Sequence, residues 1–118
     1  MKEKFDYVRM SYVEEIAGGD IEFKKELINI FLKQIPDFIS NMKKYLNEGN
    51  YEALAKEAHT AKSSAMIFLM EETGNTLRKI QSDAKKGNRE KLPSLIKKVE
   101  DKLNKASEEL SAYLKNLE

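Results

Sequence analysis

The 118-residue chain contains no cysteine and no tryptophan, only two prolines and a single histidine. Without cysteine it has neither a disulfide framework nor a thiolate metal site, which fits a reducing compartment. No apolar run approaches the ~18 residues that a membrane-spanning helix needs, and the N-terminal residues lack the apolar run of a secretory signal peptide. We therefore expect a soluble, cytoplasmic protein that does not enter a membrane.

An excess of charge of either sign is also missing. Lysine and arginine number 21 against 20 aspartate and glutamate, and the formal net charge is +1. Such a balance gives no general reason to expect binding to nucleic acid or to a membrane surface. We interpret the basic run from Arg78 to Lys105 as a solvated helix face. The length predicts a single domain over residues 1–118 with one core.

Apolar residues recur at helical spacing in the first half of the chain. A short helical pattern over residues 7–17 stops at Gly18-Gly19, where the chain can turn left-handed at low cost. Asp20 is a good N-cap for a long helix, and Pro36 in its middle predicts a kink or a break near residues 32–35. The apolar positions expected to form the stripes of these two segments are Val8, Tyr12, Val13 and Ile16, then Ile21, Ile28, Phe31, Ile35, Phe38 and Met42.

Three more helices are predicted in the second half. Gly49-Asn50 and Gly87-Asn88 each combine a C-terminal glycine with an N-capping asparagine. The first helix should run from Tyr51 to between Met66 and Met70, and Glu71-Glu72 suits the first turn of the next helix. That next helix has a stripe of Thr73, Leu77, Ile80 and Ala84, and the last has Leu92, Ile96, Val99, Leu103, Ala106, Leu110, Tyr113 and Leu117 at 4-3 spacing.

No segment alternates in the manner of a strand, and the connections between the helices are short. Four long amphipathic helices with short loops bury their stripes most simply as an antiparallel bundle. The sequence therefore predicts an all-α fold, an up-down-up-down four-helix bundle. The short N-terminal helix would cap one end or flank the bundle.

The single histidine, His59, lies in the predicted helix that begins at Tyr51. At about 100° per residue it falls roughly 140° from the centre of the apolar stripe, so its imidazole should face solvent. Lys62 follows at i+3 and Ser63 at i+4, so both are helical neighbours of the histidine. The stripe that defines the opposite, core side consists of Leu54, Ala58, Ala61, Ala65 and Phe68.

Apolar residues also continue on the histidine's side of this helix. Met66, Ile67 and Met70 fall there when the helical angle is extended past His59. Exposed apolar side chains of this kind either are covered by another segment or form a docking surface. Together with Lys56 they form the predicted partner interface.

The segment Ala58-His59-Thr60-Ala61-Lys62-Ser63 resembles the Ala-His-x-hydrophobic-Lys-Gly motif of the histidine-containing phosphotransfer family of two-component phosphorelays. The similarity extends over residues 18–88 at least, including Gly19-Asp20 and Ile35-Pro36. The departures are bulkier residues where the family usually has glycine or another small residue, namely Ser63, Met66 and Leu69.

This resemblance implies a phosphocarrier without kinase activity of its own. His59 would accept the phosphoryl group, Lys62 would neutralise its charge, and Ser63 would be the small residue beside it, able to donate a hydrogen bond. The expected partners are response-regulator receiver domains and a hybrid sensor histidine kinase, and the expected oligomeric state is a monomer. No cofactor or metal is expected on this chain, since the resemblance places magnesium on the receiver.

Two other functions remain open at this point. The chain could be a catalytically silent adaptor that binds a partner through the face around Met66, Ile67 and Met70. It could also be an enzyme that uses His59 with a carboxylate such as Glu52, although an exposed helix face offers no cleft and no second convergent group.

Overall fold

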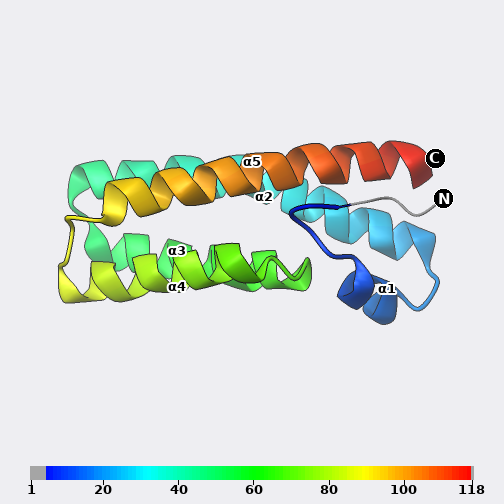
Figure 1. The fold of residues 1–118 in the computed structure, drawn as a ribbon, viewed down its shortest axis with the longest axis horizontal. Helices are drawn as coiled ribbons and strands as arrows, with labels where there is room; N and C mark the ends of the chain where they lie inside the picture. The colour runs from blue at the N-terminus through cyan, green and yellow to red at the C-terminus, as the bar shows by residue number, and fades with distance from the viewer. Residues whose placement is uncertain (1–4, 118) are drawn as a thin grey trace.

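The computed structural model describes residues 5–117, which form five helices and the segments that join them (Figure 1). The helices are α1 (Ser11–Ala17), α2 (Ile21–Glu48), α3 (Tyr51–Ile67), α4 (Glu71–Lys86) and α5 (Leu92–Leu117). Each of the four long helices packs against two others, in the order α2, α3, α4, α5 and back to α2. This closed ring of neighbours confirms the predicted up-down-up-down bundle with a short N-terminal helix.

The helix ends predicted at Asp20, Gly49-Asn50 and Gly87 are also confirmed, but the predicted cap at Asn88 is wrong, because α5 begins only at Leu92. The Asp20 carboxylate accepts a hydrogen bond from the backbone N–H of Phe23 at 3.1 Å, and the Asn50 amide oxygen accepts one from Ala53 at 3.2 Å. Gly49 and Gly87 end α2 and α4 at φ 68° and 74°, a left-handed conformation that glycine adopts without steric cost. These junctions place the start of α3 and therefore the register of His59.

The core lies between the four long helices, and α3 contributes mainly small side chains to it. Ala58, Ala61 and Ala65 are completely buried, so the neighbouring helices can approach α3 closely. At the end of α3 the ring of Phe68 stacks on that of Phe31 from α2, with centroids 4.7 Å apart. The alanine side of α3 is thereby fixed toward the core, and its opposite side toward solvent.

Pro36 does not break α2, which continues unbroken from Ile21 to Glu48. Proline cannot donate a hydrogen bond to the carbonyl of Leu32, four residues earlier. Pro36 lies on the exposed side of the helix, where water can satisfy that carbonyl. Of the kink or break predicted near residues 32–35, the break is therefore wrong.

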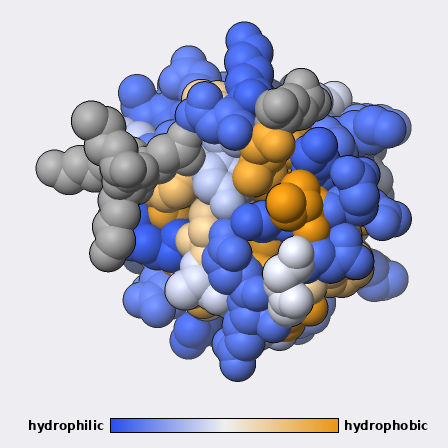
Figure 2. Space-filling model, turned by 90° about the vertical axis from the view of Figure 1, so that its right-hand side faces the viewer, coloured by the Kyte–Doolittle hydropathy of each residue, from blue (hydrophilic) through white to orange (hydrophobic). Residues whose placement is uncertain are grey.

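Helix α1 flanks one end of the bundle, beside the first turns of α2 and beyond the end of the α3–α4 hairpin (Figure 1). The space exists because α2 and α5 have 28 and 26 residues while α3 and α4 have 17 and 16. At ~1.5 Å per residue the longer pair extends about 15 Å further. Only part of the predicted stripe is buried there: Val8 and Val13 are buried, but Tyr12, Ile16 and Ile21 are 42%, 40% and 50% exposed. Figure 2, which views this end, shows patches of hydrophobic surface among hydrophilic residues.

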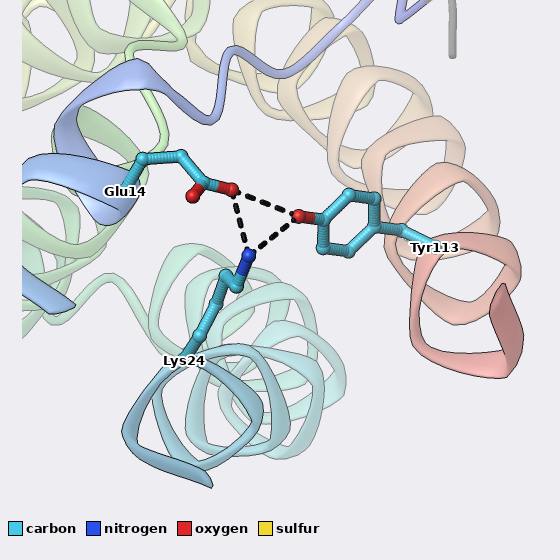
Figure 3. Close-up of polar contacts among 3 residues, drawn as sticks. All are labelled: Glu14, Lys24 and Tyr113. Carbon is cyan, nitrogen blue, oxygen red and sulfur yellow. Dashed lines mark hydrogen bonds and ion pairs between the residues drawn. The ribbon is translucent and has the colours of Figure 1, made fainter. Parts of the chain in front are cut away.

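Polar contacts between distant parts of the sequence hold this end together. Lys24 donates to Glu14 at 2.8 Å and to the Tyr113 hydroxyl oxygen at 3.1 Å, and the Tyr113 hydroxyl donates to Glu14 at 3.0 Å (Figure 3). The Glu109 carboxylate accepts hydrogen bonds from three consecutive backbone N–H groups, those of Asp6, Tyr7 and Val8. We call Glu14, Lys24, Tyr113 and Glu109 the terminal clamp, because they tie α1 and the segment before it to α2 and α5.

Candidate functional site

His59 lies on the solvent side of α3, one residue after the completely buried Ala58. Within residues 5–117 no hydrogen bond or ion pair involves its imidazole ring. Both ring nitrogens are therefore free to meet a group brought by a partner. We call the exposed side of α3 that carries His59, Lys62 and Ser63 the histidine face.

Lys62 is half-buried, and its aliphatic stem lies against α4. A Cβ atom placed on Gly74 would lie 3.8 Å from Lys62 Cγ, which shows how closely the stem passes that residue. Lys62 also lines a groove of about 310 Å³ between α3 and α4. The ion pairs among residues 5–117 do not include Lys62, so its ammonium remains available to neutralise an anion near His59.

The same groove brings in Arg78, which the sequence analysis assigned only to a solvated face. Arg78 lines the groove together with Lys62 and Met66, and its guanidinium donates to the Asn75 amide oxygen at 3.3 Å. The contact of Met66 with Gly74 sets the antiparallel register of α3 and α4, which places Arg78 about level with Lys62. The proximity of Arg78 to Lys62 depends on how two helices pack together, so the residue spacing within either helix could not have revealed it.

The Ser63 hydroxyl donates a hydrogen bond to the backbone carbonyl oxygen of His59 at 3.2 Å. This is the common i to i−4 bond of serine within a helix. In this rotamer the hydroxyl is directed along the helix and not outward from it. The property that Ser63 contributes to the histidine face is therefore its small size, while a hydrogen bond to an incoming group requires a different rotamer.

Of the four residues of the predicted partner interface, three reach the surface and one does not. Lys56 is exposed and pairs with Glu52, its Nζ 3.6 Å from the carboxylate, while Met66 and Ile67 are half-buried. Met70 is only 3% exposed and belongs to the core. The prediction failed for Met70 because α3 ends at Ile67, so a helical angle extended beyond that residue no longer describes the chain.

Leu69, which stands in the turn after α3, has a φ of 53°. A non-glycine residue in this left-handed region is sterically strained, by roughly 1–2 kcal/mol. It is one of the positions where the family that the sequence resembles usually has a small residue. The chain forms the turn without glycine, and the backbone N–H of Arg9 donates to the Phe68 carbonyl oxygen at 2.9 Å beside it.

Ile30 on α2 was not predicted as a site residue. The Asn41–Glu57 hydrogen bond of 3.0 Å and the Phe31–Phe68 stack fix the antiparallel register of α2 and α3, which brings Ile30 level with Ile67. Ile30 is 48% exposed. The sequence signal that could have identified Ile30 as a surface residue is that it is an isoleucine outside the buried stripe of α2. Ile30 and Ile67 together provide apolar surface beside the histidine face.

The geometry does not assemble a catalytic centre around His59 and Glu52. Glu52 lies seven residues before His59, about 10 Å along the helix at 1.5 Å per residue, and it pairs with Lys56. No group of three or more His, Cys, Asp or Glu side chains within residues 5–117 is arranged to hold a metal ion. In that same part of the chain no helix has both the length and the hydropathy to cross a bilayer.

The fold and the site define an all-α bundle that presents one unpartnered histidine, with a lysine beside it, on the outer face of one helix. The Hpt domain family matches residues 26–117. The chain therefore belongs to the Hpt family, the histidine-containing phosphotransfer domains.

Two known proteins are similar to the chain. The phosphorelay intermediate protein YPD1 of Candida albicans is 29% identical over 83 residues, which cover 70% of this chain and 45% of that protein, so the chain matches about half of its relative's length. The crystal structure of histidine-containing phosphotransfer protein B (HptB) from Pseudomonas aeruginosa PAO1 superposes with a TM-score of 0.87. It covers 96% of this chain and 98% of its own at 13% sequence identity, and it supports the fold.

Proposed function

We propose that this chain is a phosphorelay intermediate that accepts a phosphoryl group on His59 from the aspartyl phosphate of a response-regulator receiver domain and passes it to another receiver. The observation that carries the proposal is the exposed, unpartnered imidazole of His59 beside Lys62 in a chain that belongs to the Hpt family. An imidazole near neutral pH is nucleophilic and reachable here from solvent.

The transfer exchanges one bond for another at phosphorus. The unprotonated nitrogen of the neutral imidazole attacks, a P–N bond forms, and the P–O bond to the aspartate breaks and returns a carboxylate to the receiver. The second ring nitrogen keeps its proton. Lys62 offsets part of the charge on the phosphoryl oxygens, and Ser63 leaves room for them. The same steps in reverse deliver the group to the second receiver.

The receiver must bring its reacting atoms to within about 3–3.5 Å of the imidazole, so it must also cover the neighbouring turns. The surface available for docking consists of Lys56 and Ser63 on α3 with the apolar side chains of Ile67 and Ile30 beside them. Ile30→Lys should leave the melting temperature nearly unchanged, because this side chain is half exposed, and should weaken receiver binding. Asn29→Lys, an exposed neighbour turned about 100° away on α2, is the matched control.

The remaining parts of the proposal follow from the division of labour in the family. The magnesium ion and the aspartate chemistry belong to the receiver, so His59 needs no cofactor of its own. The phosphoryl group originates on a hybrid sensor histidine kinase, and this chain does not phosphorylate itself from ATP. It works as a monomer in the cytoplasm.

A two-stage transfer experiment tests the proposal. A receiver domain labelled with ³²P is incubated with the chain, the donor is removed, and a second receiver is added. Label should pass first to the chain and then to the second receiver, and His59→Gln should block the first step. A His59→Gln protein that still takes the label would contradict the proposal. If receivers bound the wild-type chain but none transferred label to it, the chain would be an adaptor and not a carrier.

A further inference from the structure

Gly74 lies in the first turns of α4, is buried, and has an ordinary helical backbone, since its φ is not among the positive values. Glycine lowers the stability of a helix relative to alanine, so neither backbone conformation nor helix propensity explains its presence. The explanation is space. A Cβ atom on Gly74 would lie 2.7 Å from Met66 Sδ and 3.5 Å from Met66 Cγ, which is too close for the sulfur. The thioether of Met66 occupies the position where any other residue would carry its side chain.

The Lys62 side chain also lies beside Gly74. Lys62 precedes Met66 by four residues, so the two side chains leave α3 on the same side, one turn apart. The stem of Lys62 passes within 3.8 Å of the same Cβ position, and both side chains line the groove that continues to Asn75 and Arg78. Lys62 forms no ion pair within residues 5–117, so the packing of its stem is the restraint on this side chain that the structure shows.

We propose that the Met66–Gly74 contact positions Lys62 for the phosphoryl group on His59, an inference that rests on the proposed function of His59. The Met66 side chain on α3 fills the space that a side chain at position 74 on α4 would occupy, so the two residues pack as a complementary pair. Met66 and Gly74 do not touch the phosphoryl group and act only through the lysine.

The first test is Gly74→Ala. The added methyl group must displace Met66, which can move because its side chain is flexible, and the fold should persist with unchanged helicity. The Lys62 stem then loses its packing position beside residue 74, so the rate constant for transfer from a saturating phosphorylated receiver should fall about five- to tenfold. The Kd for that receiver should change less than about twofold, because the docking surface is untouched.

Two further variants separate positioning from general damage. Gly74→Ala combined with Met66→Ala gives the new methyl group room, and the double variant should regain most of the lost rate. In a Lys62→Met background, Gly74→Ala should slow transfer no further, because the lysine through which it acts is gone. We expect an NMR contact between the Lys62 side chain and the Gly74 Hα protons in the wild type, and we expect it to be weaker in the Met66→Ala variant, which still has glycine at position 74.

Three results would overturn the inference: Gly74→Ala transferring at the wild-type rate, an equal slowing in the Lys62→Met background, or no rescue in the double variant. These results can be distinguished from a failure of the proposed function by the behaviour of the wild-type chain. If the wild-type chain takes no label on His59 from any phosphorylated receiver, the role of His59 fails. If the wild type takes the label and Gly74→Ala does so equally fast, only the positioning inference fails.

Discussion

The terminal clamp and the histidine face use polar side chains in opposite ways. In the clamp, Glu109 accepts three backbone N–H groups, and Glu14, Lys24 and Tyr113 bond to one another across three helices. On the histidine face, the His59 ring has no partner within residues 5–117, and Ser63 bonds only to its own helix. The difference shows that the fold is tied at the end where a short helix needs support, while the reactive groups are left uncommitted for a partner.

The largest effect on stability is expected on the buried side of the same helix that carries His59. Ala61→Asp places an unpaired carboxylate at a completely buried position and should destabilise the protein by more than about 3 kcal/mol. Thermal unfolding followed by circular dichroism measures this. Thr60→Asp puts the same charge on the exposed neighbour and should cost less than about 1 kcal/mol. Equal losses for the two variants would show that the facing of α3 is misassigned.

A smaller loss is expected when the clamp is opened at Glu109. Glu109→Ala leaves the N–H groups of Asp6, Tyr7 and Val8 without their acceptor and should lower the free energy of unfolding by about 1–3 kcal/mol. Glu108→Ala, an exposed neighbour, is the control. Phosphoryl transfer should be unchanged in both variants under conditions where they are folded. A loss of transfer in folded Glu109→Ala would mean that the clamp and the histidine face are coupled.

The clamp should also make stability depend on pH. The hydrogen bond from Lys24 lowers the pKa of Glu14 below its usual 4.5, burial opposes this shift, and the bond from Tyr113 adds to the lowering. A carboxylate whose pKa is lower in the folded state contributes stability above pH 4.5, and the contribution is lost as the pH falls through the folded value. Because the Glu14 side chain is 49% exposed and screened by solvent, we expect this contribution to be below about 1 kcal/mol.

Glu14→Gln should remove this loss of stability at acid pH, and Glu15→Gln should preserve it, as urea unfolding at several pH values would show. If Glu14→Gln left the acid-side pH dependence of stability unchanged, that dependence would arise from other carboxylates.

At alkaline pH the clamp should lose stability as the pH rises. The hydrogen bond to Glu14 raises the pKa of Lys24 above 10.5, and burial raises the pKa of Tyr113 above 10.0. The contributions of these two groups are present at neutral pH and are lost as the pH rises through their folded pKa values.

The smallest effect on stability is expected at the residue with the largest effect on function. His59→Gln should change the free energy of unfolding by less than about 0.5 kcal/mol, because the ring is exposed and unpartnered. Chemical denaturation measures the difference. A loss comparable to that of Ala61→Asp would mean that the imidazole is packed into the fold and is not available to a partner.

Features that depend on local sequence were predictable. Gly49-Asn50 and Gly87-Asn88 located two helix junctions, and the alanine stripe gave the facing of His59, because capping and helical periodicity act over a few residues. The position of Met70 was not predictable in this way. It depends on the turn at Leu69, which adopts a positive φ without the glycine that would have signalled it.

Features that join distant segments were not predictable either. The hydrogen bonds of Glu109 span more than 100 residues of sequence. The steric reason for glycine at position 74 is recognisable only once α4 lies against Met66. A glycine in a helix and a glutamate near the end of another helix carry no sign of these roles. The packing of the Lys62 stem against α4 therefore became visible only in the three-dimensional structure.

The measurement that tests the central claim most directly is the mapping of the phosphoryl group after incubation with a phosphorylated receiver. Tandem mass spectrometry at alkaline pH, which preserves a phosphoramidate, should place the phosphoryl group on the peptide that contains His59, and brief acid treatment should remove it. A phosphoryl group found on another residue, or one that survives acid, would contradict the account of His59 as the acceptor.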